Sequence, residues 1–86
     1  MQFLIMEEIG RVAHYYNRIG VAAVVLSKPL RIGDRIRIKG HTTDFEQTVE
    51  SMEINHKPVS EALPGDLVGI KVKDRVRKKD VVYRLD

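Results

Sequence analysis

The residues of this sequence whose type and spacing best suit a chemical role are basic, and the role that they suit is the binding of phosphate groups. Three of them alternate within residues 35–39, and residues 67–84 hold seven basic residues against two acidic ones. Alternate residues of a strand share one face, so each segment can present a row of cations, and such rows bind phosphates with salt-dependent affinity. The alternative reading is that these basic residues form an ordinary solvent-exposed surface without a ligand. The candidate nucleic-acid-binding residues are Arg35, Arg37, Lys39, His41, Lys71, Lys73, Arg75 and Arg77.

Two adjacent aromatic residues offer a second kind of contact. Tyr15 and Tyr16 follow His14 and precede Arg18, and aromatic rings beside cations can stack on unpaired bases. Packing against the body of the protein is the alternative reading, because aromatic side chains more often serve a core.

Other chemistry is missing from the 86 residues. There is no phosphate-binding loop motif, which predicts no nucleotide binding by the chain itself. There is no cysteine, and the three histidines lack the spacing of a metal pair. No nucleophile stands beside a base in a known motif. The sequence therefore predicts a protein that is not an enzyme and that holds no metal and no cofactor.

The distribution of charge and apolar residues sets expectations about partners and location. Residues 42–66 hold six acidic residues and one basic residue, so basic and acidic segments could form two faces of opposite sign. No apolar run reaches the length of a membrane span, which predicts no membrane partner. A chain without cysteine suits a reducing compartment, and we expect a cytoplasmic location.

The elements that must position these residues are short β-strands. Turn residues interrupt β-branched runs every 8–12 residues, which is typical of a small all-β barrel or sandwich. Residues 45–54 allow two readings: a strand with a bulge near residues 50–51, or a helix, since Phe45, Val49 and Met52 follow helical spacing. The strand is preferred because its neighbours are strands. The six expected strands are 8–14, 20–26, 35–39, 45–54, 67–73 and 81–85. Gly10 inside the first of them indicates a bulge or a close approach of backbones, and Ile36 and Ile38 share the face of the third that lies opposite its cations.

Two Gly-Asp pairs are the main turn signals. Gly33 and Gly65 can adopt backbone angles closed to other residues, and Asp34 and Asp66 can accept hydrogen bonds from nearby backbone N–H groups. Each pair opens an alternating segment. We interpret all four residues as structural turns and not as ligands.

These turns carry a family resemblance that covers residues 8–85. The segment LRIGDRIRIKG from Leu30 to Gly40 and the segment GDLVGI from Gly65 to Ile70, with VESM from Val49 between them, resemble the second-domain β-barrel of elongation factor Tu and related translational GTPases. The chain is similar to stand-alone translation elongation factor-like proteins. One departure is Lys79-Asp80, where the family has a glycine turn; because lysine tolerates positive φ poorly, we expect this last turn to differ in shape.

The resemblance implies both a fold and a function. It implies a small closed six-stranded β-barrel over residues 8–86, with residues 1–7 as an N-terminal extension that is either disordered or part of the first strand. It also implies a translation-factor-like module that binds RNA, either tRNA or ribosomal RNA, or the ribosome through its basic face. The alternative is a protein-protein interaction module that docks on a partner enzyme or translation factor, with the acidic segment meeting a basic partner.

Overall fold

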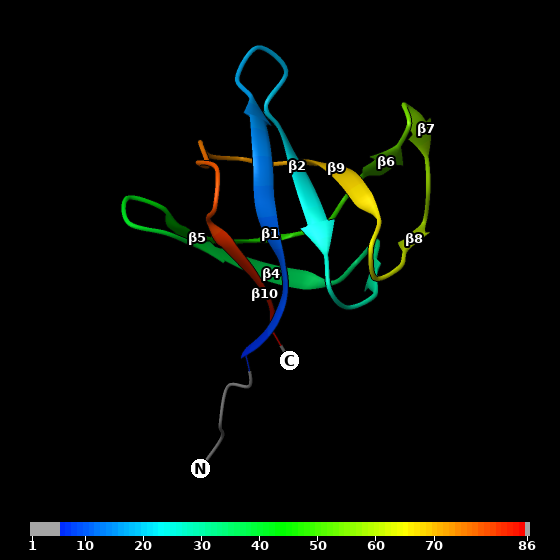
Figure 1. Ribbon diagram of the computed structural model, residues 1–86, viewed down its shortest axis with the longest axis horizontal. Helices are drawn as coiled ribbons and strands as arrows, with labels where there is room; N and C mark the ends of the chain where they lie inside the picture. The colour runs from blue at the N-terminus through cyan, green and yellow to red at the C-terminus, as the bar shows by residue number, and fades with distance from the viewer. Residues whose placement is uncertain (1–5, 86) are drawn as a thin grey trace.

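The computed structural model describes residues 6–85, which form ten β-strands and contain no helix (Figure 1). The all-β prediction is confirmed, and the helical alternative for residues 45–54 is wrong. Residues 1–5, which the sequence placed in an N-terminal extension, and residue 86 lie outside the described part. The strands are β1 (Met6–Tyr16), β2 (Val21–Leu26), β3 (Leu30–Arg31), β4 (Arg35–Lys39), β5 (Asp44–Thr48), β6 (Met52–Ile54), β7 (Lys57–Pro58), β8 (Glu61–Ala62), β9 (Leu67–Lys71) and β10 (Val81–Leu85).

Eight of these strands form one sheet, in the order β5-β4-β10-β1-β2-β9-β6-β7, and β3 pairs with β8 in a second, two-stranded sheet. All the pairs are antiparallel. β1 and β2 form a long hairpin whose turn projects from the rest of the molecule (Figure 1). β5 and β7 remain as the two edges of the described large sheet, so the expected closed six-stranded barrel is wrong in its closure and in its number of strands.

The segment 45–54 breaks into two strands. β5 ends at Thr48 and β6 starts at Met52, and between them Val49 turns its side chain fully into the core. Val49 donates its N–H to the Asp34 carbonyl at 2.8 Å, which ties the end of β5 to the turn before β4. The chain then leaves β4 and pairs with β9 instead. A change of partner, and not a bulge within one strand, explains the change of parity.

Gly10 lies inside β1, where the sequence indicated a bulge or a close approach of backbones. The register between β1 and β10 shifts between Glu8 and Gly10. A Cβ atom at Gly10 would lie 2.6 Å from the carbonyl oxygen of Val25. Both expectations are confirmed, and only glycine allows β2 to pass this close.

Three turns of one shape connect the strands. In each of them an aspartate accepts a hydrogen bond from the backbone N–H three residues before it and donates its own N–H to the carbonyl of that same residue. The residue before the aspartate has positive φ: 96° at Gly33, 90° at Gly65 and 79° at Lys79. The expectation that the Lys79-Asp80 turn differs in shape is therefore wrong, because the aspartate bonds hold lysine in the conformation that glycine adopts elsewhere. The N–H to carboxylate bonds are Arg31 to Asp34 (3.0 Å), Leu63 to Asp66 (2.8 Å) and Arg77 to Asp80 (2.8 Å).

One core joins both sheets. It consists of β-branched and aliphatic side chains from the inward positions of β1, β2, β4, β9 and β10, together with residues of the connections, such as Val76. Burial of such side chains is the main source of stability in a domain of this size. The largest fully buried side chains are Ile9, Leu30, Ile36, Ile38, Met52 and Ile70.

Candidate functional site

Two of the three predicted cations of β4, Arg35 and Arg37, are paired with acidic residues of the neighbouring strand, whereas Lys39 is exposed. The guanidinium of Arg37 makes two hydrogen bonds to the Asp44 carboxylate, at 2.8 and 2.9 Å. These bonds lower the pKa of Asp44 and raise the pKa of Arg37. Arg35 lies 3.8 Å from Glu46 and donates to the Thr48 hydroxyl at 3.3 Å. The β4–β5 pairing therefore sets both arginines against carboxylates.

The predicted cations at the end of β9 and after it differ in their surroundings: two make contacts within the protein and two are exposed. Lys71 donates from Nζ to the carbonyl of Ile19 at 2.6 Å, and the Lys73 ammonium stands 5.9 Å from the centre of the Phe45 ring. Arg75 and Arg77 lie exposed in the connection between β9 and β10.

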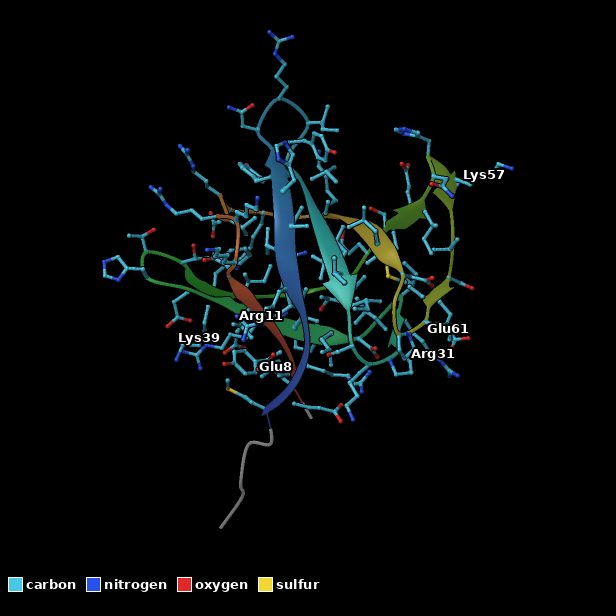
Figure 2. All side chains as sticks on the ribbon, viewed as in Figure 1. Glu8, Arg11, Arg31, Lys39, Lys57 and Glu61 are labelled. Atoms are coloured by element: carbon cyan, nitrogen blue, oxygen red, sulfur yellow. The ribbon has the colours of Figure 1, made fainter. Side chains whose placement is uncertain are left out.

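Three ion pairs join the acidic segment 42–66 to the basic residues that precede it. Arg31 of β3 and Glu61 of β8 are 2.7 Å apart, and their side chains lie together in Figure 2. Lys39 is labelled in the same view on a different part of the surface. Together with Arg35–Glu46 and Arg37–Asp44, this pair brings part of the acidic segment beside basic residues, so the two kinds of charge are not separated in this part of the surface. The pairing also leaves fewer cations for phosphate groups.

The remaining predicted binding residues do not gather at one place. His41 lies exposed in the loop between β4 and β5. Tyr15 packs against the core, which matches the alternative reading for this residue. Tyr16 points the opposite way, is 49% exposed and meets the His14 ring edge-on at 4.4 Å. The two tyrosines thus lie on opposite faces and cannot stack on neighbouring bases together.

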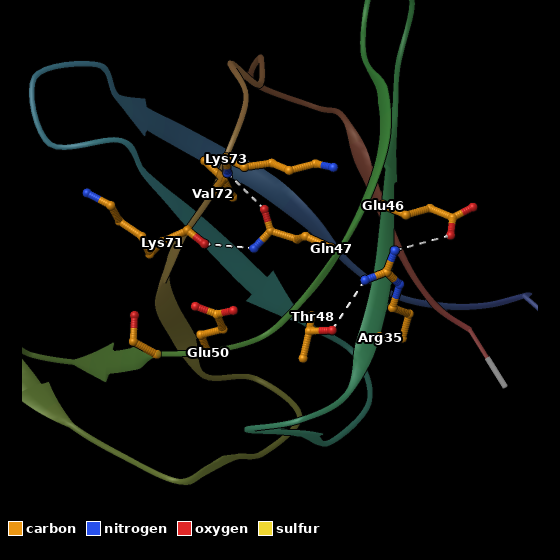
Figure 3. Close-up of a pocket in the computed structure, with 9 residues that line it drawn as sticks. Arg35, Glu46, Gln47, Thr48, Glu50, Lys71, Val72 and Lys73 are labelled. Carbon is orange, nitrogen blue, oxygen red and sulfur yellow. Dashed lines mark hydrogen bonds and ion pairs between the residues drawn. The ribbon is translucent and has the colours of Figure 1, made fainter.

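A polar groove of about 610 Å³ lies between β5 and the end of β9, where the described sheet does not close (Figure 3). The Gln47 side chain crosses this gap. Its Nε2 donates to the Lys71 carbonyl at 2.8 Å, and its Oε1 accepts from the Lys73 N–H at 2.9 Å. The Gln47 side-chain amide thus makes the two bonds to residues 71 and 73 that a neighbouring strand would otherwise make. The lining residues are Arg35, Glu46, Gln47, Thr48, Glu50, Ser51, Lys71, Val72 and Lys73.

Sequence reasoning did not single out Gln47, although a signal for it exists. Phe45, Gln47 and Val49 share one parity, so a polar side chain stands in a row of core residues. Gln47 is only 9% exposed. A buried amide needs hydrogen-bond partners, and its position predicts a structural role across the core face.

A second concavity, the apolar hollow, has a volume of about 370 Å³ and lies on the outer face of β2, β9 and β6. Small residues meet at its middle rung, where Ala23 of β2 faces Gly69 of β9. Larger apolar side chains stand around them, partly exposed: Ile19 at 58% and Leu67 at 54%. The hollow is lined by Tyr16, Ile19, Val21, Ala23, Glu53, Asn55, His56, Leu67 and Gly69.

Two kinds of feature are absent from the described part of the chain. Within residues 6–85, no group of three or more His, Asp or Glu side chains is placed to hold a metal ion. None of these residues belongs to a helix that could cross a lipid bilayer.

The chain is similar to parts of larger proteins whose names are those of peptidases. It is 48% identical over 79 residues to an uncharacterized protease of Methanocaldococcus jannaschii, a match that covers 91% of this chain and 19% of the relative. It is 39% identical over 80 residues to a collagenase of Porphyromonas gingivalis, covering 91% of this chain and 22% of that protein. The chain thus spans about a fifth of the length of these relatives. No family model matches it.

A solved structure shows the same fold. It is the C-terminal domain of a Geobacillus thermoleovorans protein assigned as a U32 peptidase, with a TM-score of 0.84 and 25% sequence identity over 88% of this chain and 96% of that domain. A second crystal structure of this domain gives a TM-score of 0.85 and covers 91% of both chains.

These likenesses correct the predicted identity and function. The similarity to elongation factor 1-alpha, for example from Archaeoglobus fulgidus, is weaker: 39% identity over 70 residues and 77% of this chain. The prediction of a stand-alone translation elongation factor-like protein is therefore wrong, and so is the translation function with RNA or ribosome binding that it implied. The turn signature that carried the resemblance belongs to a fold that the peptidase relatives share.

Proposed function

We propose that the chain is an accessory domain of the kind found at the C-terminus of U32 peptidases. In this proposal the domain binds the peptidase domain through its surface and carries no catalytic residues itself. The likeness to a solved C-terminal domain over nearly its whole length supports this assignment. The relatives have about four fifths of their length outside the matched region. That remainder is large enough to hold the chemistry that their names imply.

The apolar hollow is the observation that carries the proposed role. Tyr16, Ile19 and Leu67 keep about half of their side-chain surface in water, and Leu67 extends the apolar surface to its strand partner Val25, which is 46% exposed. Apolar side chains scattered singly need no explanation, whereas a contiguous concave set of them marks a protein-binding surface. The middle rung consists of Ala23, Gly69 and Glu53, so its β2–β9 part carries no charge and its β6 end carries a carboxylate.

The shape of the hollow indicates how a partner would be held. The small middle rung lets an apolar side chain of the partner enter between Ile19 and Leu67, as an anchor residue enters a pocket at other interfaces. Glu53 stands at the β6 end of the middle rung, and together with His56 it can supply the polar part of the contact. The acidic segment 42–66 contributes Glu53, Asn55 and His56 to this surface, and its other carboxylates lie outside the hollow.

The test measures binding between this domain and the Methanocaldococcus jannaschii protease from which the matched segment has been deleted. Isothermal titration should detect association, and Leu67→Lys should weaken it by at least about tenfold, because a charge then enters a desolvated pocket. Leu63→Lys is the matched control, since Leu63 is also leucine, is 53% exposed and lies outside the hollow. Equal loss in both variants, or no association with the unmodified domain, would refute the proposed role.

A further inference from the structure

The two edges of the described large sheet differ in how they are protected. At one edge, β7 has two residues, and one of them is Pro58, which has no N–H to offer. At the other edge, β5 has five residues without proline and borders the polar groove. Very short strands, prolines and charged side chains are the usual means of protecting an edge. β5 lacks the first two, and its charged residues, Asp44 and Glu46, are paired with arginines of β4.

The hydrogen bonds at each end of the β4–β5 pair identify the backbone groups that face the groove. Val49 donates to Asp34 at one end, and Gly40 donates to Thr43 at the other. In an antiparallel pair, hydrogen-bonded residues alternate with residues whose N–H and C=O point away. Starting from the bond at either end of the pair, this alternation leaves the backbone N–H and C=O groups of Glu46 and Thr48 pointing away from β4.

On the opposite wall of the groove, the backbone groups nearest to Gln47 already have partners. Gln47 takes the Lys71 carbonyl and the Lys73 N–H, and Val72 donates its N–H to Gly20 at 2.9 Å. Within residues 6–85, β5 pairs with β4 alone. The groove therefore has one wall bonded through the Gln47 amide and, opposite it, the unpaired edge of β5 (Figure 3).

We propose that an extended polypeptide segment binds in this groove by adding a strand to the free edge of β5, with its backbone bonded to Glu46 and Thr48. Only an extended peptide offers N–H and C=O groups at the spacing of a strand, which is how strand addition achieves affinity without a fixed sequence. This site is distinct from the apolar hollow and does not depend on the proposed docking role.

The charges of the groove favour a basic residue at one end of the guest. Arg35 lies against Glu46, Lys71 is bonded to Ile19, and Lys73 stands over Phe45. Glu50, just past the end of β5, is exposed and makes no ion pair with residues 6–85. In the antiparallel orientation, which is the more stable one, the N-terminal end of the guest lies near Glu50, so a lysine or arginine there is complementary.

The probe is the peptide acetyl-Lys-Thr-Val-Thr-Val-Thr-amide, which has the predicted basic end and strand-forming residues. Its titration into the isotopically labelled domain, followed by NMR, should shift the amide signals of Glu46 and Thr48 most. A second peptide, N-methylated at the alternate residues that face β5, cannot make the edge bonds and should bind at least about tenfold more weakly.

Thr48→Pro removes one donor of the free edge, and the position is one at which a strand edge tolerates proline. This variant should lose affinity for the probe by at least about tenfold, whereas the matched Thr48→Val keeps the backbone N–H and should stay within about twofold. Leu67→Lys should leave peptide binding unchanged. Absence of shifts at Glu46 and Thr48, or equal binding of the two peptides, would overturn the proposal even if Thr48→Pro fails to fold.

Discussion

Replacing Lys79 by glycine should make this domain more stable, although it removes a side chain from the surface. Lys79 has a φ of 79° in a turn whose two counterparts use Gly33 and Gly65 at the same place. A residue with a Cβ atom loses about 1–2 kcal/mol in such a conformation. Glycine removes that strain but gives the unfolded chain more freedom, which costs about 0.4–1 kcal/mol.

The net gain is therefore about 0.5–1 kcal/mol in the free energy of unfolding, which corresponds to a rise in Tm of about 2–8 °C for a domain of this length. Urea unfolding followed by circular dichroism and a thermal melt both measure it. Lys79→Ala controls for the lost charge, because alanine keeps the strain and removes the ammonium. Lys78→Gly controls for chain freedom, because Lys78 is not among the residues with positive φ; this variant should be less stable than the unmodified domain.

The comparison that decides the matter is between glycine and alanine at position 79. If Lys79→Gly is no more stable than Lys79→Ala, the backbone of this turn is not strained and the equivalence of the three turns fails. If both variants gain equally, the charge of Lys79 is the cause. Only a gain confined to glycine fits the reasoning from φ.

Two further predictions concern the β4–β5 region. Gln47→Met keeps the size of the side chain but leaves the Lys71 carbonyl and the Lys73 N–H without their bonds. Urea unfolding should therefore show that the free energy of unfolding falls by about 1–3 kcal/mol. An unchanged midpoint would contradict the bridging role. The Arg37 guanidinium holds the pKa of Asp44 below its ordinary value of 3.8, so this pair stabilises the fold above that pH and its contribution disappears as the pH falls through the lower, folded-state pKa. NMR titration should place the Asp44 midpoint below 3.8 and should show it rising in Arg37→Gln, whereas an equal midpoint in both proteins would show that the pair does not form in solution.

The strands themselves were readable from residue order. The alternation in residues 35–39 predicted β4 with Ile36 and Ile38 inside, and both are buried. Gly10, a glycine inside a strand segment, likewise predicted the bulge of β1. Such features could be predicted because they depend on the period of a strand and on the angles open to one residue, and neither depends on distant parts of the chain.

The sequence predicted a translation function wrongly because its clearest local signal, the Gly-Asp turns, reflects backbone geometry and not a binding surface. The Gly33-Asp34 and Gly65-Asp66 turns are built by backbone angles and carboxylate bonds, so any protein with this arrangement of strands can use them. The chain resembles elongation factor 1-alpha and the peptidase relatives alike. A signature of this kind identifies a fold, and function must be argued from surfaces.

The sequence by itself determined the all-β class, the turn positions and the inward rows of apolar residues, since each follows from chemistry within a few neighbouring residues. Tertiary structure alone decided that Asp44 and Glu46 would neutralise the β4 arginines, that Gln47 would bridge to residues 71–73, and that Ala23 would meet Gly69 beneath an apolar rim. Each of these depends on which strands become neighbours. That choice is made by the burial of the whole core at once, and no short segment contains it.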